Sequence, residues 1–313
     1  MDSSDLYNVK QQFFLGAFKA LVDLTAPNAS SEDYIPILVY KARAHIALGD
    51  TQAVSNLIPS DTENVALKAV SALAKYTSGA DAEPTLEELR DLCVEIEGED
   101  ADVNEREKGL VRVIAGTAFA RAGEVEEALE TLGAETSTEN LEAVAIIVQI
   151  YLSIHRPDLA RKEFERAKHW AEDDLLLQLI EASIGLVTGK DSYADCSSFY
   201  TEQLANPSLS SPHMLTSRGV TRLLRGEIAE AKSDLEEAVA QQGGNEDADT
   251  LADSVVAAGL GAAKKDEAEQ LFSRLSSRYP THPLVATLNE KAAQFDEFAA
   301  KYPIPPLAIP TAS

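Results

Sequence analysis

Apolar residues recur along this chain at intervals of three and four, the spacing of one face of an α-helix, while strand-like alternation is scarce. Gly and Asn/Pro clusters separate the periodic segments, as short turns between helices require. Ser211-Pro212 and His282-Pro283 place Pro at a first helical position, and Thr85 and Thr136 each open an apparent capping box. The pattern predicts an all-α fold.

The predicted helices come in matching pairs. In the best-defined pair, Gly219 of the first helix and Ala231 of the second stand at the small positions of the tetratricopeptide unit of about 34 residues. Small residues that face each other let two helix backbones approach closely. The small position of the second helix recurs near the repeat length at Ala128, Ala160, Ala194 or Cys196, Ala231 and Ala268. We therefore expect a curved α-solenoid of tetratricopeptide-like helical hairpins.

The same pattern divides the chain. A single helical-repeat domain over residues 1–301 would contain about eight helix pairs and a C-terminal closing helix over 283–301. The third pair fits the repeat poorly, and the sixth carries extra residues around Gly189. Residues 302–313 include several prolines, which cannot continue a helix, so we expect an extended or disordered tail. The pairs are expected at 5–26, 33–58, 62–97, 105–133, 139–170, 173–206, 211–242 and 247–279.

Composition narrows the choice of partner. The chain has 52 Asp and Glu against 27 Lys and Arg, a formal net charge of -25. Such a surface repels phosphate backbones and anionic headgroups, so nucleic acid and direct membrane binding are disfavoured, and a basic or neutral protein is favoured. No apolar run approaches the ~20 residues of a bilayer span. The two cysteines, Cys93 and Cys196, are interpreted as free thiols of a cytoplasmic protein.

The first helices of the pairs predict a binding surface. In tetratricopeptide repeats the first helix lines the concave face, and here the residues at its inward positions are mostly apolar. An open apolar groove is typical of an interaction site, and this one would enclose a helix or hairpin of a partner. Alternatively, these residues are simply core, because a tightly wound solenoid buries both faces. The predicted partner-binding residues are Leu110, Val113, Ala145, Gln149, Leu152, Leu176, Leu179, Ser183, Leu186, Val220 and Leu223.

No arrangement of residues predicts catalysis. The five histidines lack metal-ligand spacing, Cys93 has no evident activating partner, and Trp170 is interpreted as a packing residue. The sequence therefore predicts a non-catalytic protein without metal or cofactor. A helical-hairpin transferase is the enzymatic alternative, and it would require a metal or phosphate site.

Several stretches together resemble the epsilon subunit family of coatomer. They are Asp5 to Lys10, Asp158 to Glu163, Glu172-Asp173-Asp174 and Leu177-Gln178-Leu179, and the resemblance spans nearly the whole chain.

The resemblance implies a scaffold subunit of the vesicle coat at the Golgi, acting in retrograde Golgi-to-ER and intra-Golgi transport. It implies that the repeats curl around a β-hairpin in the C-terminal region of the alpha subunit. By wrapping this region, they would stabilise it. Other coatomer subunits would be contacted indirectly, and Golgi membranes only peripherally. The alternative is an adaptor or co-chaperone that grips peptide termini. It would need a Lys/Arg clamp on the concave face, where Arg43 lies but too few further cations join it.

Overall fold

The fold is a helical solenoid. The computed structural model describes residues 3–98, 103–136, 139–207, 210–244, 246–260 and 265–302, and no residue in these ranges is in a strand. The predicted all-α class is confirmed. The single domain over residues 1–301 stays a prediction, and the predicted tail lies, except for Tyr302, outside the described residues.

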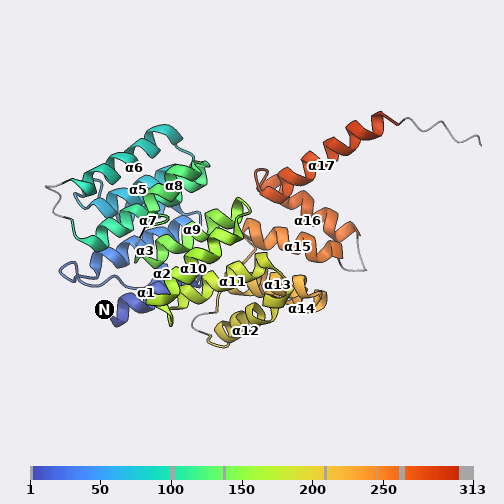
Figure 1. Ribbon diagram of the computed structural model, residues 1–313, viewed down its shortest axis with the longest axis horizontal. Coiled ribbons are helices and arrows are strands. Elements are labelled where there is room, and N and C mark those ends of the chain that lie inside the picture. The colour runs from blue at the N-terminus through green and yellow to red at the C-terminus, as the bar shows by residue number, and fades with distance from the viewer. Residues whose placement is uncertain are drawn as a thin grey trace, which may run out of the picture.

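Within the described ranges, eight hairpins and a closing helix follow one another, in the order that Figure 1 shows. The hairpins are α1 (Ser4–Phe14) with α2 (Phe18–Asp23), α3 (Tyr34–Ala47) with α4 (Thr51–Leu57), α5 (Val65–Thr77) with α6 (Ala82–Glu97), α7 (Glu105–Ala122) with α8 (Val125–Leu132), α9 (Leu141–Ser153) with α10 (Pro157–Ala171), α11 (Leu175–Thr188) with α12 (Tyr193–Leu204), α13 (Pro212–Arg225) with α14 (Ile228–Gln242), and α15 (Ala248–Leu260) with α16 (Lys265–Arg278). The closing helix is α17 (Pro283–Ala300).

Two of the predicted helix starts are confirmed and two are wrong. Ser211 accepts a hydrogen bond from the amide of Met214 at the start of α13, and His282 caps α17. Thr85, however, lies inside α6, where its hydroxyl donates to the carbonyl oxygen of Asp81. Helix α9 is capped by Asn140 rather than by Thr136, because Asn140 directly precedes the first turn and its side chain reaches two free amides.

Small residues bring the two helices of a hairpin together. A Cβ on Gly116 of α7 would lie 2.5 Å from Cγ of Leu132 in α8, and one on Gly219 of α13 would lie 3.1 Å from Cγ of Leu235 in α14. A Cβ at Gly116 would therefore clash, and one at Gly219 would fit only if Leu235 moved by a few tenths of an ångström. The predicted small positions of the second helices are fully buried at Ala128, Ala160 and Ala231.

The sixth hairpin uses Cys196 at its small position. Cys196 is buried, Ala194 is exposed, and a Cβ on Gly185 would lie 2.8 Å from the Cys196 sulfur. The extra residues predicted near Gly189 form a short 3₁₀ helix, Lys190–Ser192, ahead of α12. The insertion shifts the repeat phase without opening the helix crossing.

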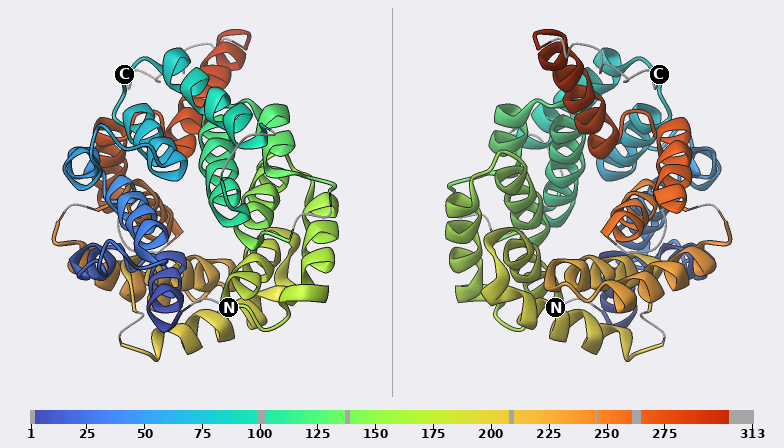
Figure 2. Two further views of the ribbon diagram at one scale, coloured as in Figure 1. Left: turned by 90° about the vertical axis from the view of Figure 1, so that its left-hand side faces the viewer. Right: turned by 90° about the vertical axis from the view of Figure 1, so that its right-hand side faces the viewer.

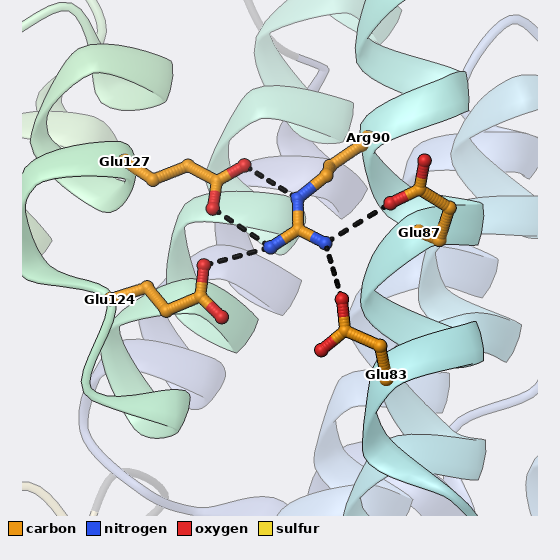
Figure 3. A network of polar contacts seen from close by, with 5 residues as sticks. All are labelled: Glu83, Glu87, Arg90, Glu124 and Glu127. Atoms are coloured by element: carbon orange, nitrogen blue, oxygen red, sulfur yellow. Dashed lines mark hydrogen bonds and ion pairs between the residues drawn. The ribbon is translucent and has the colours of Figure 1, made fainter.

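The third hairpin is regular although it fits the repeat poorly in sequence. Arg90 of α6 ties it to α8, with nitrogen–oxygen distances of 2.7 Å to Glu127 and 2.8 Å to Glu124 (Figure 3). Within α6, Glu83 and Glu87 hold the same guanidinium at 3.3 and 3.1 Å. Hydrogen bonds from Arg90 lower the pKa of Glu127. One cation thus joins two hairpins through four carboxylates.

The solenoid curls until its first hairpin meets its seventh. Figure 2 shows the helices arranged around a central opening, with α13 passing beside the N-terminal hairpin. At this seam the hydroxyl of Ser211 donates to the carbonyl oxygen of Leu15, and the Leu15 side chain is buried with Tyr200 and Met214. A Cβ on Gly16 would lie 2.7 Å from Cβ of His213. The first six hairpins and the start of the seventh therefore form a closed ring.

Candidate partner-binding cavity

A cavity of about 950 Å³ lies on the inner side of this ring. The first helices of five hairpins line it, together with the end of α10 and the turn that leads into α11. Helix α1 reaches it because Leu6 and Val9 pack against Ile37 and Tyr40 of α3. We call it the ring cavity. Its lining residues are Tyr7, Lys10, Gln11, Phe14, Pro36, Tyr40, Glu105, Arg106, Gly109, Leu110, Val113, Glu139, Asn140, Leu141, Glu142, His169, Trp170, Ala171, Glu172, Asp173, Asp174, Leu175 and Leu176.

Two aromatic side chains are the most exposed large apolar residues that line the ring cavity. Tyr7 on α1 is 57% exposed, and Trp170 at the end of α10 is 37% exposed. Trp170, which the sequence analysis interprets as a packing residue, is thus partly exposed at the cavity. Aromatic side chains with an apolar body and a polar tip dominate many protein interfaces.

Arg43 is held in the wall beside the cavity. Its guanidinium lies 2.7 Å from a Glu142 carboxylate oxygen and 4.4 Å from the centroid of the Phe13 ring. The Tyr40 hydroxyl donates to the other Glu142 oxygen. Both ends of the Arg43–Glu142 pair are nearly buried, so this arginine fixes α3 against α9. It is therefore committed to Glu142 and does not supply the Lys/Arg clamp that the adaptor alternative requires.

The rim of the ring cavity is acidic. Its lining contains six carboxylates and two permanent cations, Lys10 and Arg106, and Arg106 lies 3.7 Å from Asp33. The summed field attracts a basic partner and repels an acidic one. The six carboxylates are those of Glu105, Glu139, Glu142, Glu172, Asp173 and Asp174.

Some of the predicted partner-binding residues line the ring cavity, and others are buried in the hydrophobic core or lie elsewhere. Leu110, Val113 and Leu176 line the ring cavity but are themselves at least nine-tenths buried. Leu152 is buried in the main core, and Gln149 is exposed. The other six are half-buried: Ala145, Leu179, Ser183, Leu186, Val220 and Leu223. The core interpretation thus accounts for four of the residues, and the role of all eleven in binding stays a prediction.

Sequence reasoning missed the contribution of α1. Packing of α1 on α3, together with the contact between Leu15 and Ser211, places Tyr7, Lys10 and Phe14 at the ring cavity. No local periodicity reports such a contact. The sequence offers one signal of a special backbone position here, which is Gly16. In the structure Gly16 has a φ of 71° at the turn between α1 and α2.

The structure was also searched for a reactive cysteine, a metal site and a membrane-spanning helix. Burial raises the pKa of Cys93 to about 11, so its thiol is protonated at neutral pH. Within the described ranges no group of three or more His, Cys, Asp or Glu side chains is placed to hold a metal ion. In the same part of the chain, no helix has both the length and the apolar character of a membrane span.

Comparisons with known proteins agree on one family. A family model described as "Coatomer epsilon subunit" matches residues 2–303. The chain is 28% identical to the "Probable coatomer subunit epsilon" of Schizosaccharomyces pombe over 96% of both chains. It is 30% identical to "Coatomer subunit epsilon-1" of Arabidopsis thaliana, over 90% of this chain and 91% of the relative.

A solved structure supports the fold alone. A tetratricopeptide repeat protein from Parabacteroides merdae superimposes with a TM-score of 0.55 at 16% sequence identity. The superposition covers 81% of this chain and 96% of the bacterial one. The predicted tetratricopeptide-like solenoid is thereby confirmed.

Proposed function

The chain belongs to the coatomer epsilon subunit family, and from that premise we propose that its ring of hairpins holds the C-terminal region of the alpha subunit. As a member of this family it is a scaffold subunit of coatomer, the complex that coats transport vesicles. The finer proposal is that a β-hairpin of the alpha subunit occupies the ring cavity, and that the other coat subunits are contacted indirectly.

The ring cavity carries this proposal. A hollow of about 950 Å³ lined by five hairpins offers an inserted segment contacts from several helices at once, which a flat docking surface does not. Exposed aromatic surface at Tyr7 and Trp170 would pack against apolar side chains of the hairpin, at about 25 cal/mol per Å² buried before association costs. The acidic rim would select a hairpin with basic residues near its base.

We further propose a non-catalytic role at the cytoplasmic face of Golgi membranes, in retrograde Golgi-to-ER and intra-Golgi transport. The contact with the membrane would be peripheral and made through the coat, because a net charge of -25 is repelled by anionic lipid headgroups.

Affinity purification of the tagged chain from its own cytosol tests the proposal. We expect stoichiometric recovery of the coatomer subunits, with alpha retained as salt strips the others. Recovery of the coat with alpha lost first would contradict the proposed contact, and recovery of a chaperone alone would favour the adaptor alternative.

A further inference from the structure

A second hollow, of about 520 Å³, is lined by residues of α10, α11 and α12. We call it the side groove. It shares no lining residue with the ring cavity, which α10 and α11 line with other residues. Ser192, the last residue of the 3₁₀ helix ahead of α12, is part of its wall. The insertion that shifts the repeat phase thus contributes to a concave surface that the proposed function does not use.

The buried part of the side groove is apolar. Phe164 of α10, Ala182 of α11 and Cys196 of α12 line it and are all buried. Phe199, which packs against the same cluster as Ala182 and Cys196, is half-buried. A partly accessible aromatic ring in a hollow offers a contact to an apolar side chain of a partner.

The exposed part of the side groove is acidic. Its lining has four exposed carboxylates against one permanent cation, Arg161. Lys168 of α10 lies 5.9 Å from the centroid of the Phe164 ring, and including it still leaves a negative balance. None of the four carboxylates forms an ion pair within the described residues. They are those of Glu165, Glu181, Asp195 and Glu202.

A hollow at the equivalent place earlier in the solenoid lacks both features. It has a volume of about 240 Å³ and is lined by α4 and α5, the second helix of one hairpin and the first of the next, as α10 and α11 are. Its described lining residues include no carboxylate and no aromatic ring, and their one charged side chain is Lys75. The acidic rim and the aromatic floor are thus properties of the side groove and not of hairpin stacking in general.

We propose that the side groove binds a basic segment of another coat chain, with an apolar side chain of the segment against Phe199 and Lys or Arg side chains beside the four carboxylates. Unpaired carboxylates around an apolar hollow are complementary to such a segment in both charge and polarity. The proposal rests on membership of the coat and not on the contact proposed for the ring cavity.

Charge decides between the possible occupants. A second copy of this chain carries the same net charge of -25, and phosphate backbones and anionic headgroups are negative too, so the four carboxylates repel all three. The chain's own residues 303–313 contain no Lys or Arg, so they cannot neutralise the groove. A basic segment of another protein can.

Photo-cross-linking in the purified coat tests this proposal. p-Benzoylphenylalanine would replace Gln178 in the side groove, and Gln52 in the hollow between α4 and α5 would be replaced as the matched control, since both glutamines are exposed. We expect position 178 to cross-link to one Lys- or Arg-rich segment of another coat chain, at several-fold higher yield than position 52. A cross-link to a second copy of this chain, to a segment without Lys or Arg, or at no more than the control yield would overturn the proposal.

Neutralising two of the carboxylates tests the role of charge. Glu165→Gln/Glu202→Gln should lower the cross-link yield at position 178 several-fold. Glu267→Gln/Glu269→Gln on α16, which makes the same change in net charge at exposed positions, should leave it unchanged. Equal effects of the two double changes would overturn the charge assignment. A photo-cross-linker at Tyr7 in the ring cavity reports the alpha contact separately, so failure at one surface is distinguishable from failure at the other.

Discussion

The hydroxyl of Ser211 donates a hydrogen bond to the carbonyl oxygen of Leu15, which lies 196 positions earlier in the chain. The same hydroxyl accepts from the amide of Met214 and so caps α13. Next to it, Gly16 packs against His213 with no room for a Cβ. The serine, the glycine and the buried side chain of Leu15 thus join the first hairpin to the seventh.

Gly16→Ala should open this seam. The new Cβ would meet Cβ of His213, which is fixed to the backbone of α13 and has little freedom to retreat. We expect a loss of ~1–3 kcal/mol in unfolding free energy from overpacking, added to the cost of a side chain at positive φ. Hydrogen exchange should also rise at the start of α13.

Gly49→Ala is the matched control. Gly49 has a similar φ of 76°, but nothing lies within 4 Å of its Cβ position. It should show the backbone cost alone and no change in exchange at α13. Equal losses in chemical denaturation for the two variants would mean that the seam contributes nothing.

Gly116→Ala should destabilise the fourth hairpin even though alanine favours helix. Its Cβ would lie 2.5 Å from Cγ of Leu132, which is buried. Overpacking of ~1–3 kcal/mol should exceed a gain of about 1 kcal/mol in helix propensity. Gly259→Ala in α15, where the Cβ meets open space, should keep most of the gain. Thermal melts that rank the two variants the other way would refute the repeat register.

The helical repeat could be predicted from the sequence, but the closure of the solenoid into a ring could not. Helical periodicity and recurrent small residues are local properties, so the hairpins and the crossings at Gly116 and Gly219 could be predicted. The contact between Leu15 and Ser211 joins segments that no period relates. Tyr7 and Trp170 come from the first and fifth hairpins, so periodicity could not place the two side chains at one cavity.

The predicted partner-binding residues of the concave face are only partly accessible, and the reason is related. Positional rules for an open solenoid assume that the concave face meets solvent. Here tight curvature buries Leu110, Val113 and Leu152 among neighbouring first helices, and periodicity alone cannot separate core from interface.

Arg90→Gln should weaken the link between the third and fourth hairpins in a pH-dependent way. Hydrogen bonds from Arg90 hold the pKa of Glu127 below its ordinary 4.5, so this stabilisation is present above that pH and lost as pH falls through the lower folded value. We expect a loss of about 1 kcal/mol at neutral pH, since the pair is partly solvent-screened. Urea titrations should show the difference from wild type vanishing in acid, and a constant difference would contradict this account.

Asp253→Asn should stabilise the eighth hairpin at neutral pH. Burial, with Asp249 and Asp247 nearby, raises the pKa of Asp253 to about 7. A carboxyl whose folded pKa is raised favours folding at low pH, and that contribution is lost as pH rises from the ordinary 3.8 through the folded value. The variant should therefore gain about 1–2 kcal/mol over wild type near pH 8, after allowance for partial solvation, and nothing near pH 4. Asp296→Asn, at an exposed position of α17 outside this cluster, is the comparison, and a gain independent of pH would refute the assignment.

The central claim is that the ring cavity binds the alpha C-terminal region. Changes at Leu176 would disturb the core, so the test uses accessible lining residues. Titration calorimetry would measure the affinity of a purified alpha C-terminal region for wild type, for Tyr7→Ser/Trp170→Ser, and for Val94→Ser as the exposed apolar control. The account predicts at least a roughly tenfold loss for the double variant, about 1.4 kcal/mol, and no change for Val94→Ser. Unchanged binding by a folded double variant would contradict the claim.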